Sequence, residues 1–234
     1  MSYLWSAATH IGRLRDGNED AVHPEGSGRN GTLVAAVADG MGGHVGGEVA
    51  SRIAIEAATA ADDGVAGRIA AANAAVVDHA AGHPRLRGMG TTLTLGVFST
   101  RPSVEIGHVG DSRAYLLRDG GLRRITEDHS VVAELLAGGM ITEDEARFHP
   151  QRNLVTRSLG LAPSIEADVE TFDLEPGDRV LLCSDGLTNM VDDDNIAGLL
   201  GEGTPDEAVW ALIEAANRAG GHDNVTVVVV DVVP

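Results

Sequence analysis

The amino-acid sequence predicts an α+β fold in which helices cover antiparallel sheets, and three observations lead to this prediction. Two helical patterns follow one another directly, at about 45–61 and 64–81, with strand-like segments before and after them. A stretch rich in short strands comes next, at about 90–125, and its short connections suit antiparallel pairing. A mainly helical part and further strands complete the chain. This order lacks the regular strand–helix alternation of a parallel α/β fold.

The expected strands are segments in which apolar and polar residues alternate or in which β-branched residues gather. The segment 116–122 places Asp119-Gly120-Gly121 between apolar residues, which is typical of a hairpin. In chain order the expected strands are 3–10, 31–38, 90–98, 103–109, 113–118, 121–125, 167–173, 178–184 and 224–232.

The expected helices carry apolar residues on one face, and two of them begin with a clear capping signal. Thr204, Pro205 and Glu207 supply the cap, the first helical residue and the reciprocal acid of a capping box. Thr142 and Glu145 repeat that spacing at a shorter helix. The expected helices are 45–61, 64–81, 129–138, 142–147, 193–200 and 205–219.

Length and composition favour one continuous domain over residues 1–234. The sequence has no internal repeat or Pro/Ser-rich linker, and 43% of its residues are hydrophobic without an apolar run long enough to span a bilayer. The N-terminus lacks the basic start and apolar stretch of a signal peptide, and Cys183 is the single cysteine, which excludes an internal disulfide. We therefore expect a cytoplasmic protein, and a monomer.

The charge balance limits the classes of partner. There are 35 acidic and 17 basic residues, for a formal net charge of −18, which repels nucleic acid and anionic lipid and attracts divalent cations. We expect no binding to nucleic acid or membranes. Every basic residue is arginine, so a P-loop lysine and a Schiff-base lysine are excluded.

Four aspartates stand at ends of strands that are expected to be buried: Asp39, Asp111, Asp185 and Asp223. A buried, unpaired carboxylate is costly, and no lysine is present to neutralise it, so a bound cation is the natural compensation. Carboxylate and carbonyl oxygens are the ligands of Mg²⁺ and Mn²⁺. Gly40 would let its carbonyl approach an ion without a side chain in the way.

An alternative interpretation of these residues stays open at this point. Asp-Gly is a common turn pair, Asp111 with Arg113 would make an ordinary surface pair, and Asp223 would simply open a strand. Arg15 lies directly after the first expected strand; its planar guanidinium suits bidentate phosphate binding, although most arginines in turns are simply solvated.

Taken together, the motifs resemble the bacterial type-2C metal-dependent protein serine/threonine phosphatases (the PPM family). They occur in the family's order and span residues 12–230. The motifs are Arg15-x-x-Asn18-Glu19-Asp20, Asp39-Gly40-Met41-Gly42-Gly43-His44 with Gly47-Glu48, Gly90-Thr91-Thr92, Val109-Gly110-Asp111-Ser112-Arg113, Ser184-Asp185-Gly186-Leu187 and Gly221-His222-Asp223-Asn224-Val225-Thr226.

The resemblance implies a four-layer αββα sandwich, two packed antiparallel sheets flanked by helices. It implies that Asp39 bridges two Mg²⁺ or Mn²⁺ ions, with the Gly40 carbonyl, Asp185 and Asp223 completing the pair, and that Asp111 with Asp185 holds a third. Arg15 would bind the substrate phosphate. The supporting residues would be Glu19 and Asp20, which order metal-bound waters, and Asn224. The segment at about 128–158 would be a flap beside the cleft, from which Asn153 approaches the third ion.

The implied activity is hydrolysis of phosphoserine and phosphothreonine in proteins, by attack of a hydroxide that bridges two metals. The implied partners are phosphorylated proteins, including serine/threonine kinases. Eukaryotic relatives carry a histidine after the Asp-Gly pair, where this sequence has Met41, so a metal-bound water is the preferred general acid. Two alternatives remain: a phosphatase for small phosphate esters, and a catalytically silent module that binds phosphoproteins.

Overall fold

The computed structural model describes residues 1–234, apart from the side chains of His44 and Arg147. The strands are β1 (Ser2–His10), β2 (Asp20–His23), β3 (Gly26–Asn30), β4 (Leu33–Met41), β5 (Gly90–Thr91), β6 (Leu93–Phe98), β7 (Ser103–Val109), β8 (Arg113–Arg118), β9 (Gly121–Arg124), β10 (Asp168–Asp173), β11 (Arg179–Cys183) and β12 (Val225–Val233). The helices are α1 (His44–Ala60), α2 (Val65–Gly82), the 3₁₀ turn η1 (Pro84–Leu86), α3 (Val131–Ala137), α4 (Glu143–Arg147), α5 (Asp185–Thr188), α6 (Asp193–Leu200) and α7 (Pro205–Arg218).

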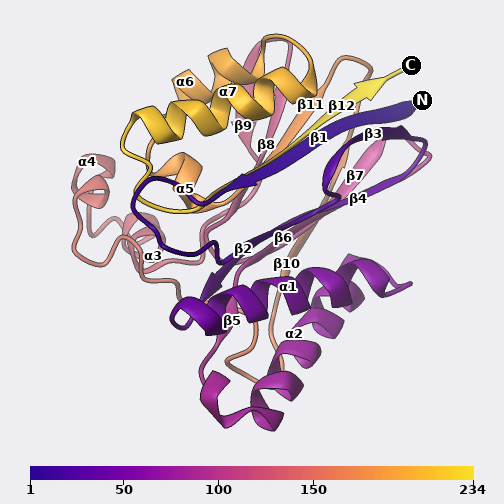
Figure 1. Ribbon diagram of the computed structural model, residues 1–234. Coiled ribbons are helices and arrows are strands. Elements are labelled where there is room, and N and C mark those ends of the chain that lie inside the picture. Colours follow the sequence, from indigo (N-terminus) through magenta and orange to yellow (C-terminus); the bar gives the residue numbers. More distant parts are fainter.

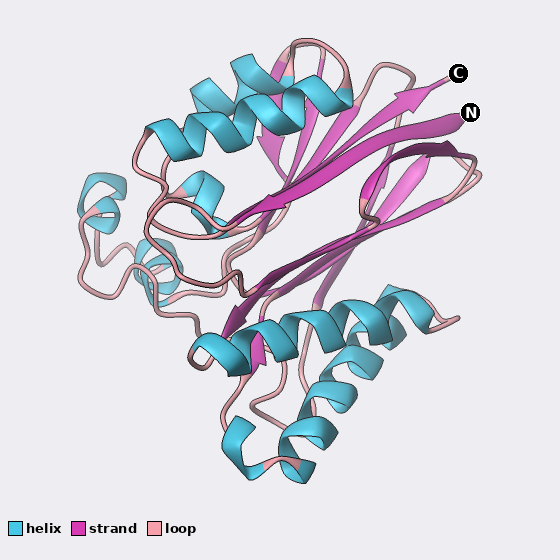
Figure 2. Ribbon diagram, in the orientation of Figure 1, coloured by secondary structure: helices cyan, strands magenta, loops and turns pink.

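The strands form two antiparallel sheets that pack face to face with helices on both outer faces (Figures 1 and 2). One sheet has the order β3-β1-β12-β11-β8-β9 and is covered by α6 and α7. The other has the order β10-β7-β6-β4-β2, with β5 paired to β4, and is covered by α1 and α2. The expected arrangement of antiparallel sheets covered by helices is therefore confirmed.

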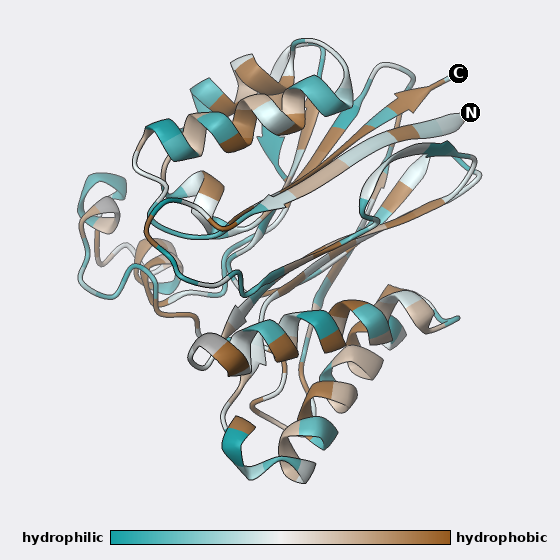
Figure 3. Cartoon of the chain, viewed as in Figure 1, coloured by the Kyte–Doolittle hydropathy of each residue, from teal (hydrophilic) through white to brown (hydrophobic). Residues whose placement is uncertain are grey.

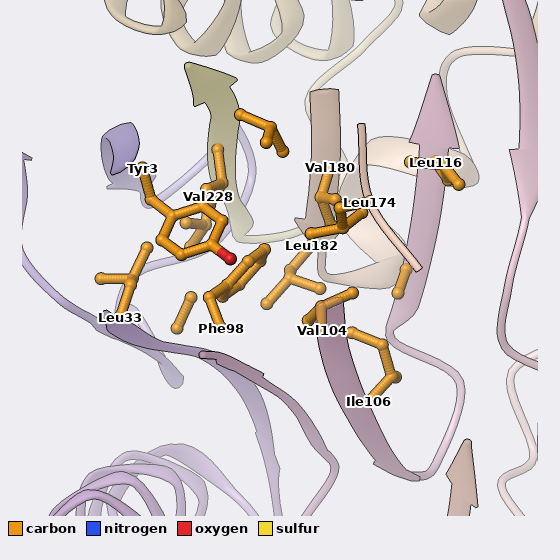
Figure 4. Close-up of a cluster of buried hydrophobic side chains, with 14 of the residues drawn as sticks. Tyr3, Leu33, Phe98, Val104, Ile106, Leu116, Leu174, Val180, Leu182 and Val228 are labelled. Atoms are coloured by element: carbon orange, nitrogen blue, oxygen red, sulfur yellow. The ribbon is translucent and has the colours of Figure 1, made fainter. Parts of the chain in front are cut away.

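Three layers of buried side chains hold the sandwich together. The layer between the sheets includes Tyr3, Phe98 and Val180, and its side chains point toward one another in Figure 4. Tyr3 packs its ring 5.1 Å from that of Phe98 and donates its hydroxyl hydrogen to the Ser99 carbonyl at 2.7 Å, so its polar atom is satisfied. The other two layers lie between each sheet and its helices. The hydrophobic side of the helices faces the sheets in Figure 3.

The predicted elements match the observed ones to within three residues at most boundaries. Both predicted capping boxes are present: the Thr204 hydroxyl accepts from the Glu207 amide and the Thr142 hydroxyl from the Glu145 amide. The expected strand 90–98 is split at Thr92, because β5 pairs with the end of β4 while β6 pairs with its beginning.

Four short elements were missed, namely β2, β3, η1 and α5. The strands β2 and β3 are short, and the sequence of β3, Gly-Ser-Gly-Arg-Asn, has low β propensity, so pairing with β1 rather than composition forms it. The four-residue helix α5 is too short to give a periodic signal. It begins at Asp185, which therefore lies on a helix rather than simply at a strand end, and Asp39 lies inside β4 rather than after it.

The segment containing α3 and α4 leaves the sandwich and returns at one place. Its two ends are joined by the bridge between Ser130 and Val155 and by the bond from the Thr156 amide to the His129 carbonyl, 2.8 Å. Figure 1 shows α3, α4 and α5 at the end of the sandwich opposite the two termini. Within the described part of the chain, no helix has both the length and the apolar character needed to cross a bilayer.

Candidate metal centre

Asp39 lies near the end of β4, where the neighbouring segment at Thr91 and Thr92 holds its backbone by hydrogen bonds. Its amide donates to the Thr92 hydroxyl at 2.9 Å, and its carbonyl accepts from the Thr92 amide at 2.9 Å and the Thr91 hydroxyl at 2.8 Å. Thr91 and Thr92 are fully buried. The Gly-Thr-Thr motif therefore fixes the backbone of Asp39, a role that the sequence did not reveal.

Gly40 follows Asp39 where three segments meet. A Cβ atom at Gly40 would lie 2.2 Å from the Gly47 carbonyl oxygen and 2.6 Å from that of Glu19. A Cβ atom at Gly47 would lie 1.9 Å from a carboxylate oxygen of Glu19. β4, the start of α1 and Glu19 therefore approach so closely that neither glycine position has room for a side chain.

Asp185 opens α5, and one of its oxygens is left without a partner. Oδ2 accepts from the Asn189 side chain at 2.9 Å, whereas Oδ1 is buried and has no hydrogen-bond partner among the described atoms. Gly186 lies directly against the Asn224 backbone, where a Cβ atom would be 1.9 Å from the carbonyl oxygen. A buried carboxylate oxygen without a donor fits a position that accepts a cation.

Asp20 lies opposite Asp39 in the pairing of β2 with β4. Its Oδ2 accepts from the Ser184 hydroxyl at 2.8 Å and the Thr226 hydroxyl at 2.6 Å. Burial raises the pKa of Asp20 to about 7; the two hydroxyls oppose this shift, and nearby Asp185 and Asp223 add to it.

The other carboxylates perturb one another in the same direction. Burial and then repulsion by Asp20, Asp185, Asp111 and Asp223 raise the pKa of Asp39 well above its ordinary value. Burial, followed by Asp185, raises the pKa of Asp111 to about 8, and the pKa of Asp185 is raised by burial and then by Asp223. The structure therefore brings the four predicted aspartates together with Asp20 in one electrostatic cluster.

Asp111 does not pair with Arg113, which excludes the surface-pair alternative. Arg113 instead donates to Asp128, from Nε at 2.9 Å and from Nη2 at 2.6 Å. His129 is also joined to the backbone before Asp111, with its amide donating to the Gly110 carbonyl at 2.7 Å. The root of the 128–158 segment is thus anchored beside Asp111.

Arg15 lies in the loop between β1 and β2, at the rim of the cluster. Its Nη2 is 2.6 Å from Oδ2 of Asp223, and 43% of its side chain is exposed, so it is neither fully solvated nor fully buried. Burial lowers the pKa of Arg15, but Asp223, followed by Glu19 and Asp39, outweighs this effect and the pKa is raised. Arg15 therefore stays charged beside the carboxylates.

The donor set suits a hard divalent cation. Several crowded carboxylates, one of them with a buried unpartnered oxygen, would be relieved by positive charge, and all the donors are oxygen atoms. Among the described side chains, however, no group of three His, Cys, Asp or Glu residues is arranged to hold an ion. The chemistry of the donor set fits such an ion.

Three further residues named from the sequence lie in different parts of the structure. Cys183 is fully buried, as expected for a small hydrophobic residue. Asn153 is exposed, and its approach to a third ion stays a prediction. The side chain of His44, at the end of the Asp-Gly motif, lies outside the described residues.

Comparisons with known proteins now decide the family. Residues 12–204 match the family model described as protein phosphatase 2C. The chain belongs to this family. It is 42% identical to the serine/threonine protein phosphatase PstP of Mycobacterium tuberculosis over 98% of this chain and 45% of PstP, so it spans about half the length of that relative. It is 38% identical to the serine/threonine phosphatase stp of Listeria monocytogenes, over 95% of this chain and 93% of the relative.

Solved structures of the protein phosphatase 2C family have the same fold. A crystal structure of the Mycobacterium tuberculosis phosphatase PstP/Ppp matches with a TM-score of 0.92 and 41% identity, over 100% of both chains. The PstP catalytic domain in complex with two manganese ions matches with a TM-score of 0.89 and 39% identity, again over 100% of both. The predicted four-layer sandwich and the resemblance to this family are both confirmed.

Proposed function

We propose that this chain is a metal-dependent phosphatase that hydrolyses phosphoserine and phosphothreonine in proteins. The observation that carries the proposal is the position of Arg15, a cation 2.6 Å from Asp223 at the rim of a carboxylate cluster. A phosphate group placed there would meet arginine donors on one side and cations held by carboxylates on the other. Such a site supplies the charge stabilisation that phosphoryl transfer needs.

The metal ligands follow from the cluster. Asp39 would bridge two ions, with the Gly40 carbonyl, Asp185 and Asp223 completing the pair, and Asp111 with Asp185 would hold a third. When bound, Mg²⁺ or Mn²⁺ supplies positive charge that polarises the phosphate and lowers the pKa of coordinated water.

The chain's own side chains bind and orient. Arg15 presents a planar fork of donors to the phosphate oxygens and holds the scissile group in place. Asp20 is fixed by the Ser184 and Thr226 hydroxyls, so its second oxygen can order water inside the site. Glu19 would also order water in the site, and its backbone amide is held by the Asn224 side chain at 2.8 Å.

Relatives support the proposal. PstP and stp are named serine/threonine phosphatases, and the PstP catalytic domain is described with two manganese ions. We extend this to the use of either Mg²⁺ or Mn²⁺, a third ion at Asp111, and phosphoprotein substrates that include serine/threonine kinases. A flap at 128–158, the monomeric state and the cytoplasmic location belong to the same proposal.

The test is hydrolysis of a phosphothreonine peptide and of p-nitrophenyl phosphate with Mn²⁺ or Mg²⁺ titrated against EDTA. We expect metal-dependent turnover of both substrates and loss of turnover on chelation. Folded protein without turnover at any metal concentration would contradict the proposal.

Adding sugar phosphates as substrates and Mn²⁺ calorimetry to this experiment separates the two alternatives. Faster turnover of sugar phosphates than of the phosphopeptide would favour a phosphatase for small esters. Phosphopeptide binding without turnover, combined with absence of Mn²⁺ binding by calorimetry, would favour a silent binding module. The acid cluster favours the enzyme, since a silent module has no need of mutually repelling carboxylates.

A further inference from the structure

The Asn224 side chain, which is distant in sequence, joins two backbone carbonyls of the loop that carries Arg15. Residues 11–19 connect β1 to β2, and the Asn224 amide group lies between the two ends of this loop. Its Nδ2 donates to the Ile11 carbonyl at 2.9 Å and to the Gly17 carbonyl at 3.0 Å. Its Oδ1 accepts from the Glu19 amide at 2.8 Å.

These three bonds use both amide hydrogens and the amide oxygen of Asn224. The reversed orientation of the amide would set its oxygen against two carbonyls and its nitrogen against an N–H group, so the contacts fix the assignment. Asn224 is only 4% exposed. Water therefore has little access to replace these bonds if the side chain is removed.

The Arg15 loop also lies directly on the loop that carries Asp223. A Cβ atom at Gly12, whose φ is +82°, would be 2.2 Å from the Asp223 carbonyl oxygen. The Arg13 amide donates to the Gly221 carbonyl at 2.7 Å. The two loops are thus also in contact at Gly221 and Asp223, so the position of one depends on the position of the other.

We propose that Asn224 is a positioning residue for phosphate binding, which acts by fixing the reach of Arg15. The inference rests on the proposed function, because it assigns Arg15 to the substrate phosphate. Ile11 and Gly17 flank Arg15 in the sequence, so a group that holds both carbonyls determines where the guanidinium lies. A small misplacement of such a binding group is enough to weaken the interaction strongly.

Loss of the Asn224 side chain can also act by two routes that leave the reach of Arg15 unchanged. Asn224 follows Asp223 in the sequence, so removing its side chain would weaken phosphate binding if it displaced Asp223, a proposed metal ligand. It is also buried, so its loss would loosen the fold without any specific effect on phosphate. A double-mutant cycle with Arg15, together with metal binding and a matched control, distinguishes all three routes.

The experiment compares wild type, Asn224→Ala, Arg15→Ala and the double variant, all with saturating Mn²⁺. Calorimetry gives the affinity for inorganic phosphate, and kinetics on p-nitrophenyl phosphate give KM and kcat. Asn224→Ala should weaken phosphate binding about tenfold, the size expected for two or three hydrogen bonds. In the Arg15→Ala background the same substitution should have almost no further effect, and KM should change more than kcat.

Mn²⁺ affinity provides a second readout that does not depend on turnover. Asn224→Ala should bind Mn²⁺ as wild type does, whereas Asp223→Asn should lose affinity. If the alanine variant does not fold, Asn224→Asp replaces it, because aspartate keeps the shape of the side chain and the acceptor for the Glu19 amide. This variant should also weaken phosphate binding, because it places an oxygen against the Ile11 and Gly17 carbonyls.

Asn73→Ala is the matched control. Asn73 is 2% exposed, and it likewise bridges two backbone groups, donating to the Ala162 carbonyl at 3.0 Å and accepting from the Gly160 amide at 2.9 Å. This variant should lower Tm and leave phosphate affinity unchanged.

Additive effects of Asn224→Ala and Arg15→Ala on phosphate affinity would overturn the inference. Loss of Mn²⁺ binding in Asn224→Ala, or an equal loss of phosphate affinity in Asn73→Ala, would overturn it as well. If the proposed function itself is wrong, the result differs: wild type shows no turnover. Calorimetry would still measure phosphate binding in that case, so the two failures are distinguishable.

Discussion

Individual carboxylates are the basis of the proposed metal site, and without a cation their effects on one another are unfavourable. Asp39, Asp111 and Asp185 each have a pKa raised by burial and by their acidic neighbours. A bound cation would offset this cost in folding free energy, which is the physical reason for assigning the cluster to cation binding.

Replacing Asp185 with asparagine tests this assignment. Asp185→Asn removes one negative charge and a strong oxygen ligand, so metal-dependent turnover should fall by more than about 100-fold. In EDTA the variant should melt at a higher temperature than wild type, because repulsion with Asp223 is relieved. Turnover assays, Mn²⁺ calorimetry and melting curves measure the three effects.

Asp119→Asn is its control. Asp119 is exposed in the turn between β8 and β9 at φ 51°, a conformation that asparagine accepts. It removes the same charge without touching the cluster, so turnover and Mn²⁺ affinity should match wild type. Wild-type turnover in Asp185→Asn would remove the metal assignment.

Asp111 lends itself to a graded prediction. Burial raises its pKa most, and Asp185 is its strongest acidic neighbour, whereas the pKa of Asp39 is raised by burial and also by Asp20 and Asp223. Asp111→Ala should therefore leave two-ion binding intact and slow turnover, with a Mn²⁺ dependence shifted to higher concentration. A Mn²⁺ titration that superimposes on that of wild type would show that the third site is dispensable.

The residues that position the cluster were harder to infer than its members. The aspartates are visible in the sequence because each stands next to glycine or at the end of an apolar run. Thr92, Ser184 and Thr226 bond to Asp39 and Asp20 across the sheets, and no local pattern predicts contacts between such distant segments. Only the resemblance to a family drew attention to these motifs, and it gave them no role.

At the scale of elements, local rules predicted the helices well and the short strands poorly. The capping boxes at Thr204 and Thr142 are local, involving residues three apart, so the sequence contains all the information. The edge strands β2 and β3 depend on partners supplied by other parts of the chain, β4 and β1. That dependence explains why their residues alone did not predict them.

The two capping boxes should differ in their effect on stability. Thr204→Ala should lower the free energy of unfolding by about 1 kcal/mol, because α7 packs six buried residues on the sheet and its first turn loses a cap. Thr142→Ala removes the same cap from the five-residue α4, which belongs to the segment outside the sandwich. It should change the global free energy of unfolding by much less.

Denaturant titration measures both free energies, and hydrogen exchange locates the change. Thr142→Ala should increase exchange only within the 128–158 segment. Equal loss of global stability in the two variants would mean that α4 unfolds together with the sandwich rather than separately.

The whole molecule combines a formal net charge of −18 with a cluster of buried acids at one end of a sandwich. The net charge attracts divalent cations from a distance, and the cluster is the site at which we propose that they bind. The general fold class was predictable because element order and hydrophobic pattern extend over the entire chain. The convergence of Asp39, Asp111, Asp185 and Asp223 was not, since it depends on how two sheets pack.

This charge arrangement predicts how stability depends on pH and metal. Without metal, burial raises the folded-state pKa to about 7 for Asp20 and to about 8 for Asp111, above the ordinary value of 3.8. Between the ordinary and the raised pKa values, the folded state therefore binds more protons than the unfolded state. Stability should therefore fall as pH rises through this window. His108 acts oppositely, because burial lowers its pKa to about 4, but its contribution is complete above pH 6.5.

Between pH 6.5 and 8.5 the acids thus dominate the pH dependence, and Tm in EDTA should fall on the order of 5 °C. With saturating Mn²⁺ the dependence should reverse, because protons and metal compete for the same oxygens and binding strengthens as protons leave. Melting curves at four pH values, with EDTA or Mn²⁺, measure both slopes. Asp39→Asn should flatten the EDTA slope, whereas Asp119→Asn should retain it. A Tm in EDTA that rises with pH over this range would mean that the carboxylates do not repel one another, and the reason for placing cations among them would be lost.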